Sequence, residues 1–180
     1  QGEIHVNSLK DKLKDKFGVE VKLLDLKVPY RETIKGKSDV QGKHKKQSGG
    51  HGQYGDVKIR FAPSSEPFEF AEEIFGGSVP KSYIPAVEKG LKESMEKGIL
   101  AGFPVTNIKA VLYDRSYHDV DSSEMAFKLA ANMAFKKGME EAKPVLLEPL
   151  MKLKIVVPEE YMGDIMGDIN KKRGKVLGME

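Results

Sequence analysis

The apolar residues in the middle of this chain follow two different spacings, and the order of these spacings constrains the fold. Apolar residues that alternate with polar ones predict strands over about 54–62 and about 105–113, and a further strand that begins at Phe68. Apolar residues three and four positions apart predict a helix that ends near Ile99 and a longer helix over about 121–142. The long helix carries apolar residues around much of its girth, which predicts burial on more than one side.

An extended stretch over about 28–46 precedes these elements, so the predicted order is strand, strand, strand, helix, strand, helix. This order is typical of the α+β class, with a mostly antiparallel sheet and helices on one face. The glycine-rich segment 47–55 and the polar segment 114–121 are predicted to be loops at strand ends. If the two strands are neighbours, both loops lie at one end of the sheet.

Further elements are predicted on either side of this central part. They are a helix over about 8–17, a strand over 19–23, a linker over 144–149, a strand over 151–157, and a helix from Pro158 with Gly174 at its C′ position. The first helix and strand carry too little apolar surface to fold alone, and both ends are expected to belong to something longer. We expect their apolar faces to pack on each other or, through exchange, on a second copy of the chain.

The composition is typical of a globular protein and excludes several kinds of site. Of the 180 residues, 39% are apolar and 32% are charged, and the formal net charge is +3. The absence of cysteine excludes disulfides and thiolate metal sites and favours a cytoplasmic location. No apolar run approaches the roughly 20 residues that span a membrane, so we expect no membrane partner.

Positive charge gathers just before the glycine-rich segment. From Lys35 to Lys46 there are five lysines and a single acid, Asp39. We predict that Lys43, Lys45 and Lys46 contact phosphate, and that the glycines after them leave no side chain to hold an RNA backbone away. A local excess of this kind favours contact with an anion at one place over a nonspecific coat of nucleic acid.

Other interpretations of the two loops remain open. The glycine-rich segment suggests a phosphate cradle, but it lacks the Lys-Ser/Thr ending of a Walker loop and a strand follows it; it is alternatively a hairpin end without a partner. His118, Asp119 and Asp121 suggest metal ligands, although Asp121 is also placed to cap the next helix and no second histidine is spaced to share a metal. His118 with Ser116 or Ser122 suggests a hydrolytic triad, but no nucleophile elbow accompanies them. We therefore expect neither a catalytic residue nor a metal in this chain.

Several segments together resemble bacterial translation elongation factor G. The three most specific are VPYRETI (28–34), SGGHGQYGDV (48–57) and SYHDVDSSEMAF (116–127). The resemblance implies that residues 1–27 end domain III, that 28–147 form a complete domain IV, and that 148–180 begin domain V. Domain IV of the family has the fold of the second domain of ribosomal protein S5, with a left-handed βαβ crossover, and domain V is ferredoxin-like.

The same resemblance implies a function on the ribosome. Family members are GTPases, but their GTP-binding domain is not among these domains, so GTP and magnesium are expected only in the missing domain and no cofactor in this chain. Domain IV of the family is an arm that mimics the anticodon arm of tRNA. It enters the decoding site of the small subunit, contacts the tRNA–mRNA duplex and promotes translocation.

The arm of the family ends in two loops, which correspond here to Ser48–Gly55 and Ser116–Asp121. Gln53 and His118 match the positions with which the family touches tRNA and mRNA. The residues that the resemblance predicts to contact RNA are Ser48, Gly49, Gly50, His51, Gly52, Gln53, Ser116, Tyr117, His118 and Asp119.

Two residues depart from the usual pattern of the family. His51 stands where many members have Arg, and Arg115 stands where many have Gly. The segment GKHKKQSGGHGQYGDV resembles a second, less typical subfamily of paralogues. Because some relatives act in ribosome recycling and others protect ribosomes from tetracycline, these roles stay open beside translocation. Domains of the S5-like fold also occur in small-molecule kinases, which leaves nucleotide binding as a further alternative.

Overall fold

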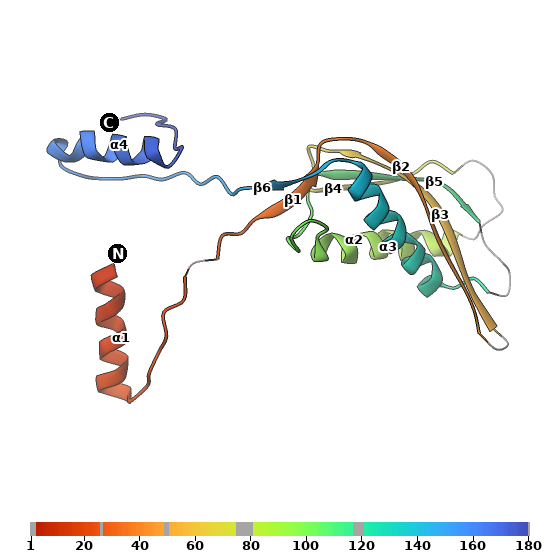
Figure 1. The fold of residues 1–180 in the computed structure, drawn as a ribbon, viewed down its shortest axis with the longest axis horizontal. Coiled ribbons are helices and arrows are strands. Elements are labelled where there is room, and N and C mark those ends of the chain that lie inside the picture. The colour runs from red at the N-terminus through yellow and green to blue at the C-terminus, as the bar shows by residue number, and fades with distance from the viewer. Residues whose placement is uncertain (1–2, 26, 49–50, 75–80, 117–120, 180) are drawn as a thin grey trace. The chain divides into compact units, whose positions relative to one another are not determined.

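The computed structural model of this protein describes residues 3–25, 27–48, 51–74, 81–116 and 121–179 (Figure 1). The chain forms two compact units, Gln1–Pro149 and Leu150–Glu180. Two short 3₁₀ helices, η1 (Lys81–Tyr83) and η2 (Glu159–Tyr161), precede longer helices. Within the described residues, no helix has both the length and the apolar character needed to cross a membrane.

The first unit contains a four-stranded sheet with the order β2-β3-β5-β4. Its strands are β2 (Ser38–Ser48), β3 (His51–Pro63), β4 (Phe68–Glu72) and β5 (Ile108–Ser116). β3 pairs antiparallel with both β2 and β5, while β4 and β5 are parallel and are connected through α2 (Ile84–Lys97). α2 and α3 (Glu124–Glu141) lie on one face of this sheet (Figure 1). The predicted α+β class, with a mostly antiparallel sheet and helices on one face, is confirmed.

The alternating apolar residues of β3 and β5 form the centre of the core. The wholly buried residues of these two strands are Val57, Ile59, Phe61, Ile108, Ala110 and Leu112. From α3, Phe135 packs its ring edge-on against Phe61, with 6.1 Å between the ring centroids. Burying a large apolar side chain contributes about 1.5–3 kcal/mol. The two-residue spacing therefore determines which face of the sheet the helices cover.

Helix α3 approaches the β2–β3 hairpin where the strands carry glycine. A Cβ at Gly42 would overlap the backbone oxygen of Ala130, and a Cβ at Gly55 would lie 2.5 Å from the backbone oxygen of Ala126. On the helix side, Ala126, Ala130 and Ala134 are fully buried. Glycine on the strands and alanine on the helix therefore bring the two backbones closer together than larger side chains allow.

A second, two-stranded sheet pairs β1 (Arg31–Ile34) antiparallel with β6 (Pro144–Leu147). Glu32 of β1 is only 1% exposed, and its carboxylate lies inside the loop that follows α2. Backbone N–H groups donate to it at 2.5–3.0 Å from Ile99, Leu100, Ala101 and Phe103. The loop closes around the carboxylate because Gly98 and Gly102 adopt left-handed φ values of 68° and 81°.

These contacts determine the charge state of Glu32. Burial raises the pKa of its carboxyl, but the four backbone donors together outweigh burial and bring the pKa below its ordinary value of 4.5. Because the pKa is depressed in the folded state, the ionised Glu32 carboxylate contributes its full stabilisation of the fold above the pKa of the unfolded state. This stabilisation is lost as the pH falls through the pKa of the folded state.

Several predictions for the flanking segments are wrong. Residues 19–23 and 151–157 alternate in sequence but form no strand, because no described segment lies beside either of them to supply hydrogen-bond partners. The predicted linker over 144–149 contains β6, since it pairs with β1. The extended stretch over 28–46 is divided into β1 and β2 by a bend at residues 35–36, and the first helix, α1 (Glu3–Phe17), begins five residues early.

The second unit contains α4 (Met162–Lys171), whose end differs by one position from the prediction. Arg173 adopts a left-handed φ of 60°, and its backbone N–H donates to the backbone oxygen of Asn170 at 3.0 Å. The backbone N–H of Gly174 donates to the backbone oxygen of Ile169 at 2.8 Å. This is a Schellman motif with Arg173 at C′ and Gly174 at C″. The glycine signal marks the helix end correctly, but the left-handed residue is the arginine before it.

We predict that Glu32→Gln destabilises the first unit by about 2–3 kcal/mol near neutral pH, because a neutral amide cannot replace a carboxylate that four N–H groups surround. Urea unfolding at several pH values between about 7 and 3 measures this difference. Only the wild type loses carboxylate stabilisation at low pH. The difference in free energy of unfolding between the two proteins should therefore decrease as the pH falls.

A matched control is Glu88→Gln, which removes an exposed carboxylate that pairs with Lys92 at 2.6 Å on α2. This change should cost less than about 0.5 kcal/mol. A difference between Glu32→Gln and the wild type that stays constant over the whole pH range would contradict the role given to the Glu32 charge.

Candidate nucleic-acid interface

The β2–β3 hairpin continues beyond the end of β5. β2 and β3 pair without interruption from Ser38 opposite Phe61 to Ser48 opposite His51. The pairing of β5 with β3 ends further back, where its last residue, Ser116, lies opposite Asp56. Residues 43–48 and 51–55 form the outer part of the hairpin, which we call the distal hairpin.

The predicted loop over 47–55 is therefore too long. Gly52, Gln53 and Gly55 belong to β3, and β2 extends to Ser48. The loop was predicted because the segment is rich in glycine. Glycine within a strand is nevertheless common where another backbone approaches closely. The residues between the two strands, 49–50, lie outside the described residues.

The bare backbones at Gly52 and Gly55 face other parts of the protein. A Cβ at Gly52 would lie 2.8 Å from the Asp121 Cγ atom, just as a Cβ at Gly55 would reach the backbone of Ala126. At these two positions the space predicted for an RNA backbone is filled by the chain itself. Contact of Gly52 with RNA stays a prediction, but the missing side chain is explained by packing.

Strand alternation divides the lysines of β2 between the two faces of the hairpin. Gly42 faces α3, so Lys46 lies on the same face and Lys43 and Lys45 lie on the other. Lys43 Nζ is 3.9 Å from Asp56 Oδ2, so its charge is partly compensated. Lys45 and Lys46 are exposed and form no ion pair within the described part of the chain. Of the three predicted phosphate contacts, these two offer the most available charge.

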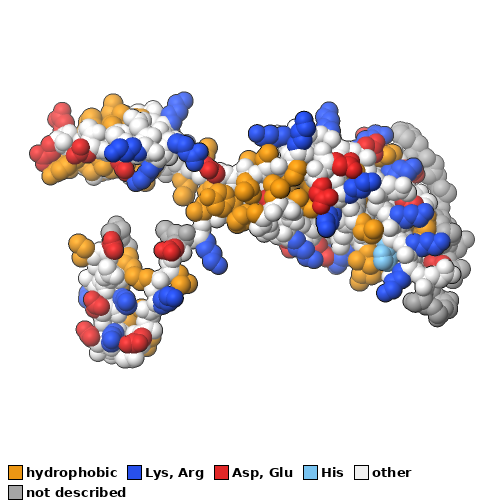
Figure 2. Space-filling model, viewed as in Figure 1, with side chains coloured by type: hydrophobic (Ala, Val, Ile, Leu, Met, Phe, Trp, Pro, Cys, Tyr) orange, Lys and Arg blue, Asp and Glu red, His pale blue; other side chains and the backbone are white. Residues whose placement is uncertain are grey.

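Basic side chains further from the hairpin end are paired with carboxylates. Lys58 Nζ lies 2.8 Å from Asp114 Oδ2, and the hydrogen bond from Lys58 lowers the pKa of Asp114. Arg60 lies 3.6 Å from both Asp39 and Glu73. Figure 2 shows basic (blue) and acidic (red) side chains close together over this part of the molecule. Pairing cancels charge over the sheet, so the excess positive charge lies at the distal hairpin.

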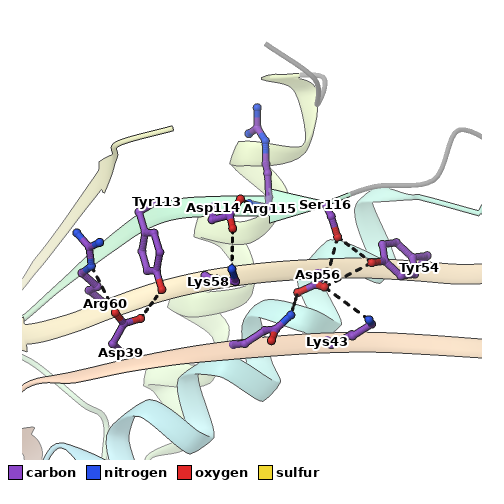
Figure 3. A network of polar contacts seen from close by, with 11 residues as sticks. Asp39, Lys43, Tyr54, Asp56, Lys58, Arg60, Tyr113, Asp114, Arg115 and Ser116 are labelled. Carbon is purple, nitrogen blue, oxygen red and sulfur yellow. Dashed lines mark hydrogen bonds and ion pairs between the residues drawn. The ribbon is translucent and has the colours of Figure 1, made fainter. Parts of the chain in front are cut away.

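Asp56, which is only 7% exposed, connects the hairpin to the end of β5 (Figure 3). Its carboxylate accepts hydrogen bonds from Gln41 Nε2 at 2.7 Å and from Ser116 Oγ at 3.3 Å. The Tyr54 hydroxyl lies 2.7 Å from the Ser116 Oγ and 3.4 Å from Asp56. Ser116, which was predicted to contact RNA, is thus bound within the protein and holds the start of the second loop against β3.

Sequence reasoning did not single out Asp56 or Tyr54. The available signal was their position in an alternating strand, on the polar face. It became informative only with the register, which places Asp56 opposite Lys43 and Tyr54 opposite Lys45. Because the loop was predicted to be longer than it is, that register could not be derived.

The other end of the second loop is also held against β3. Tyr54 N–H donates to the Asp121 backbone oxygen at 2.8 Å, and Gly52 N–H donates to Asp121 Oδ1 at 3.0 Å. Ser122 Oγ donates to the Tyr54 oxygen at 3.1 Å. Since Ser116 and Asp121 both lie beside β3, the prediction that the two loops share one end of the sheet is confirmed for the residues that flank the second loop.

The predicted helix cap at Asp121 is wrong. The N-cap of α3 is Ser123, whose Oγ accepts the Ala126 N–H at 3.2 Å. Ser123 has the extended backbone of a typical N-cap, with φ −146° and ψ 160°. Asp121 is therefore available to bind Gly52, a tertiary contact that no local spacing rule predicts.

The remaining predicted residues divide between described and undescribed positions. Gln53 is exposed, and its Oε1 lies 2.9 Å from His44 Nε2. Outside the described residues lie Gly49, Gly50, Tyr117, His118 and Asp119, together with the side chains of Ser48 and His51. Within the described residues, no group of three or more His, Cys, Asp or Glu side chains is placed to hold a metal ion.

Arg115, the bulky cation before the second loop, turns inward. Its side chain is 3% exposed and lies 3.8 Å from Glu72. Burial lowers the pKa of the guanidinium, and the neighbouring Glu72 carboxylate opposes this shift. The arginine therefore adds little charge to the surface beside the distal hairpin.

Comparison with known proteins identifies two family matches that together cover most of the chain. The model of elongation factor G, domain IV, matches residues 26–143, and the model of the elongation factor G C-terminus matches residues 145–180. A crystal structure of a protein from Thermus thermophilus is 54% identical in sequence and superimposes with a TM-score of 0.90. That similarity covers 99% of this chain and 27% of the other, so the chain spans about a quarter of the length of the protein it matches.

We predict that Gly55→Ala destabilises the first unit by about 2–3 kcal/mol, because the new Cβ must displace the backbone of α3 at Ala126. Denaturant unfolding measures the loss. The control is Gln47→Ala, at an exposed position of β2, which should change stability by less than about 0.5 kcal/mol. Equal stability of Gly55→Ala and the wild type would show that α3 does not constrain the hairpin.

Proposed function

The chain belongs to the elongation factor G family, and from this premise we propose that its domain IV region is a ribosome-binding arm of a longer translational GTPase. In this proposal the arm enters the decoding site of the small subunit and contacts the tRNA–mRNA duplex during translocation. The observation that carries the proposal is the distal hairpin, a projecting ribbon on which Lys45 and Lys46 are exposed without carboxylate partners among the described residues. Phosphate groups are the natural ligands of such charges.

The proposed action is steric and electrostatic. A two-stranded ribbon alone is only marginally stable in water, but this one is packed against α3 through Gly42 and Gly55. Hydrogen bonds from Gly52 and Tyr54 to Asp121 hold the second loop to the same ribbon. Both features support an arm that keeps its shape when it enters a confined RNA site. Hydrolysis of GTP, with its magnesium ion, is assigned to another part of the longer protein.

The two lysines and Gln53 would have different roles at the decoding site. Lys45 and Lys46 lie on opposite faces of the ribbon, so they can neutralise phosphates on both sides of it. Gln53 presents an amide, which can donate and accept hydrogen bonds. His118 is proposed to join Gln53 at the contact with tRNA and mRNA, on the basis of the family resemblance.

We predict that the longer protein carrying both Gln53→Ala and His118→Ala moves tRNA and mRNA at least about tenfold more slowly, since removing about 1.4 kcal/mol of contact energy has this effect. Ribosome-stimulated GTP hydrolysis should stay near the wild-type rate. Rapid-mixing measurements of mRNA movement and of phosphate release separate the two steps. The control is Lys92→Gln, at an exposed ion pair of α2. Parallel loss of both activities would contradict the proposed separation of roles.

We also predict that Lys45→Gln with Lys46→Gln weakens binding of this chain to the small ribosomal subunit and reduces its dependence on salt. Each phosphate contact contributes about 0.7–0.9 to the slope of log affinity against log salt, so the slope should fall by about 1.5. Binding titrations at several salt concentrations test this. An unchanged slope would mean that these lysines do not face phosphate.

A further inference from the structure

The distal hairpin carries a small polar pocket on its side. The pocket has a volume of about 130 Å³ and includes Lys45 and Lys46 from β2, Gly52 and Tyr54 from β3, and Asp121 from the segment before α3. These residues come from three separate parts of the chain. By strand alternation, the Lys45 side chain lies on the same face of the hairpin as Gly52 and Asp121, whereas the Lys46 side chain lies on the other face. The pocket therefore combines one ammonium group with one carboxylate, beside a glycine that offers no side chain of its own.

The carboxylate of Asp121 is only partly used by the protein. Oδ1 accepts the Gly52 N–H at 3.0 Å, whereas Oδ2 has no hydrogen-bond partner or cation within the described residues. Asp121 is half-buried and is one of the residues that line the pocket. The contacts of Gly52 and Tyr54 with its backbone and side chain keep this acceptor in place.

This combination restricts the kind of ligand that fits. A free phosphate would be attracted by Lys45 but repelled by the Asp121 carboxylate. An ionised carboxylate only accepts hydrogen bonds, so the ligand must bring a donor as well as a negative charge. A ribonucleotide has both on neighbouring atoms, because the ribose 2′-hydroxyl lies beside the 3′-phosphate.

Resting on the proposed ribosomal function, we propose that this pocket binds the sugar–phosphate backbone of RNA and distinguishes it from DNA. Lys45 binds the phosphate, and the Asp121 carboxylate accepts a hydrogen bond from the 2′-hydroxyl of the same nucleotide. A base amine is a weaker candidate for the donor, since it lies across the sugar from the phosphate that Lys45 holds. Recognition through the 2′-hydroxyl is how proteins discriminate RNA from DNA at a given position.

The test compares binding of this whole chain to a fluorescent single-stranded oligouridine and to the same oligomer made of 2′-deoxyuridine, at low salt. Anisotropy titrations give the two dissociation constants. A hydrogen bond to a charged acceptor corresponds to about tenfold or more in affinity, so the RNA should bind about tenfold more tightly than the deoxy oligomer. Asp121→Ala should reduce this ratio to about twofold or less, by the loss of the same hydrogen bond.

Two further variants separate the carboxylate from its surroundings. Ser122→Ala removes the hydrogen bond from Ser122 Oγ to the Tyr54 backbone oxygen, so it loosens the segment that also contains Asp121. Because Ser122 does not line the pocket, the ratio between the affinities for RNA and for the deoxy oligomer should stay unchanged. Lys45→Gln should weaken the binding of RNA and of the deoxy oligomer by the same factor, because both contain phosphate. Circular dichroism checks that each variant is folded.

The outcomes distinguish this inference from the proposed function. The role of the carboxylate is overturned if the wild type binds both oligomers equally. It is also overturned if Asp121→Ala and Ser122→Ala reduce the preference for RNA over the deoxy oligomer to the same extent. Either result leaves a phosphate-binding arm in place. Absence of binding to either oligomer overturns the pocket as a nucleotide site. Normal translocation by the Gln53→Ala, His118→Ala variant would overturn the proposed function independently, since neither side chain supplies the Asp121 contact.

Discussion

The close approach of α3 to the β2–β3 hairpin is the constraint on which the candidate interface depends. The hairpin extends past the last residue of β5, so the sheet alone does not support its outer part. Gly42 and Gly55 leave room for the backbone of the helix at Ala130 and Ala126. Any larger residue at these strand positions would separate the two elements. The glycines of this region therefore serve packing at least as much as any approach of a ligand.

At the other end of the first unit, a single carboxylate organises the loop between α2 and β5. Glu32 is buried without a cationic partner among the described residues, but its charge is compensated by four backbone N–H groups. Leaving such a group without these bonds would cost several times the energy of one ordinary hydrogen bond. The carboxylate thus connects the small β1–β6 sheet to the larger one, and the strength of the connection depends on pH.

Charge is distributed so that the surface of the sheet is nearly neutral and the hairpin end is positive. Lys58 and Arg60 are paired with carboxylates, and Arg115 is buried beside Glu72. Lys45 and Lys46 are exposed beyond these pairs. Since screening limits the reach of exposed charges to about 10 Å at ordinary salt, this local excess matters more for the proposed binding of RNA than the net charge of +3.

The sequence by itself determined the α+β class and the buried face of β3 and β5, because the two-residue and helical spacings depend on local geometry alone. The motifs also identified the family, and the basic residues before Gly49 located the candidate interface. Only the tertiary structure decided that the glycine segment is mostly strand, that Asp121 binds Gly52 while Ser123 caps α3, and that Asp56 joins the hairpin to Ser116. Each of these depends on residues distant in the chain, and a residue's local pattern does not state which distant backbone or side chain will lie beside it.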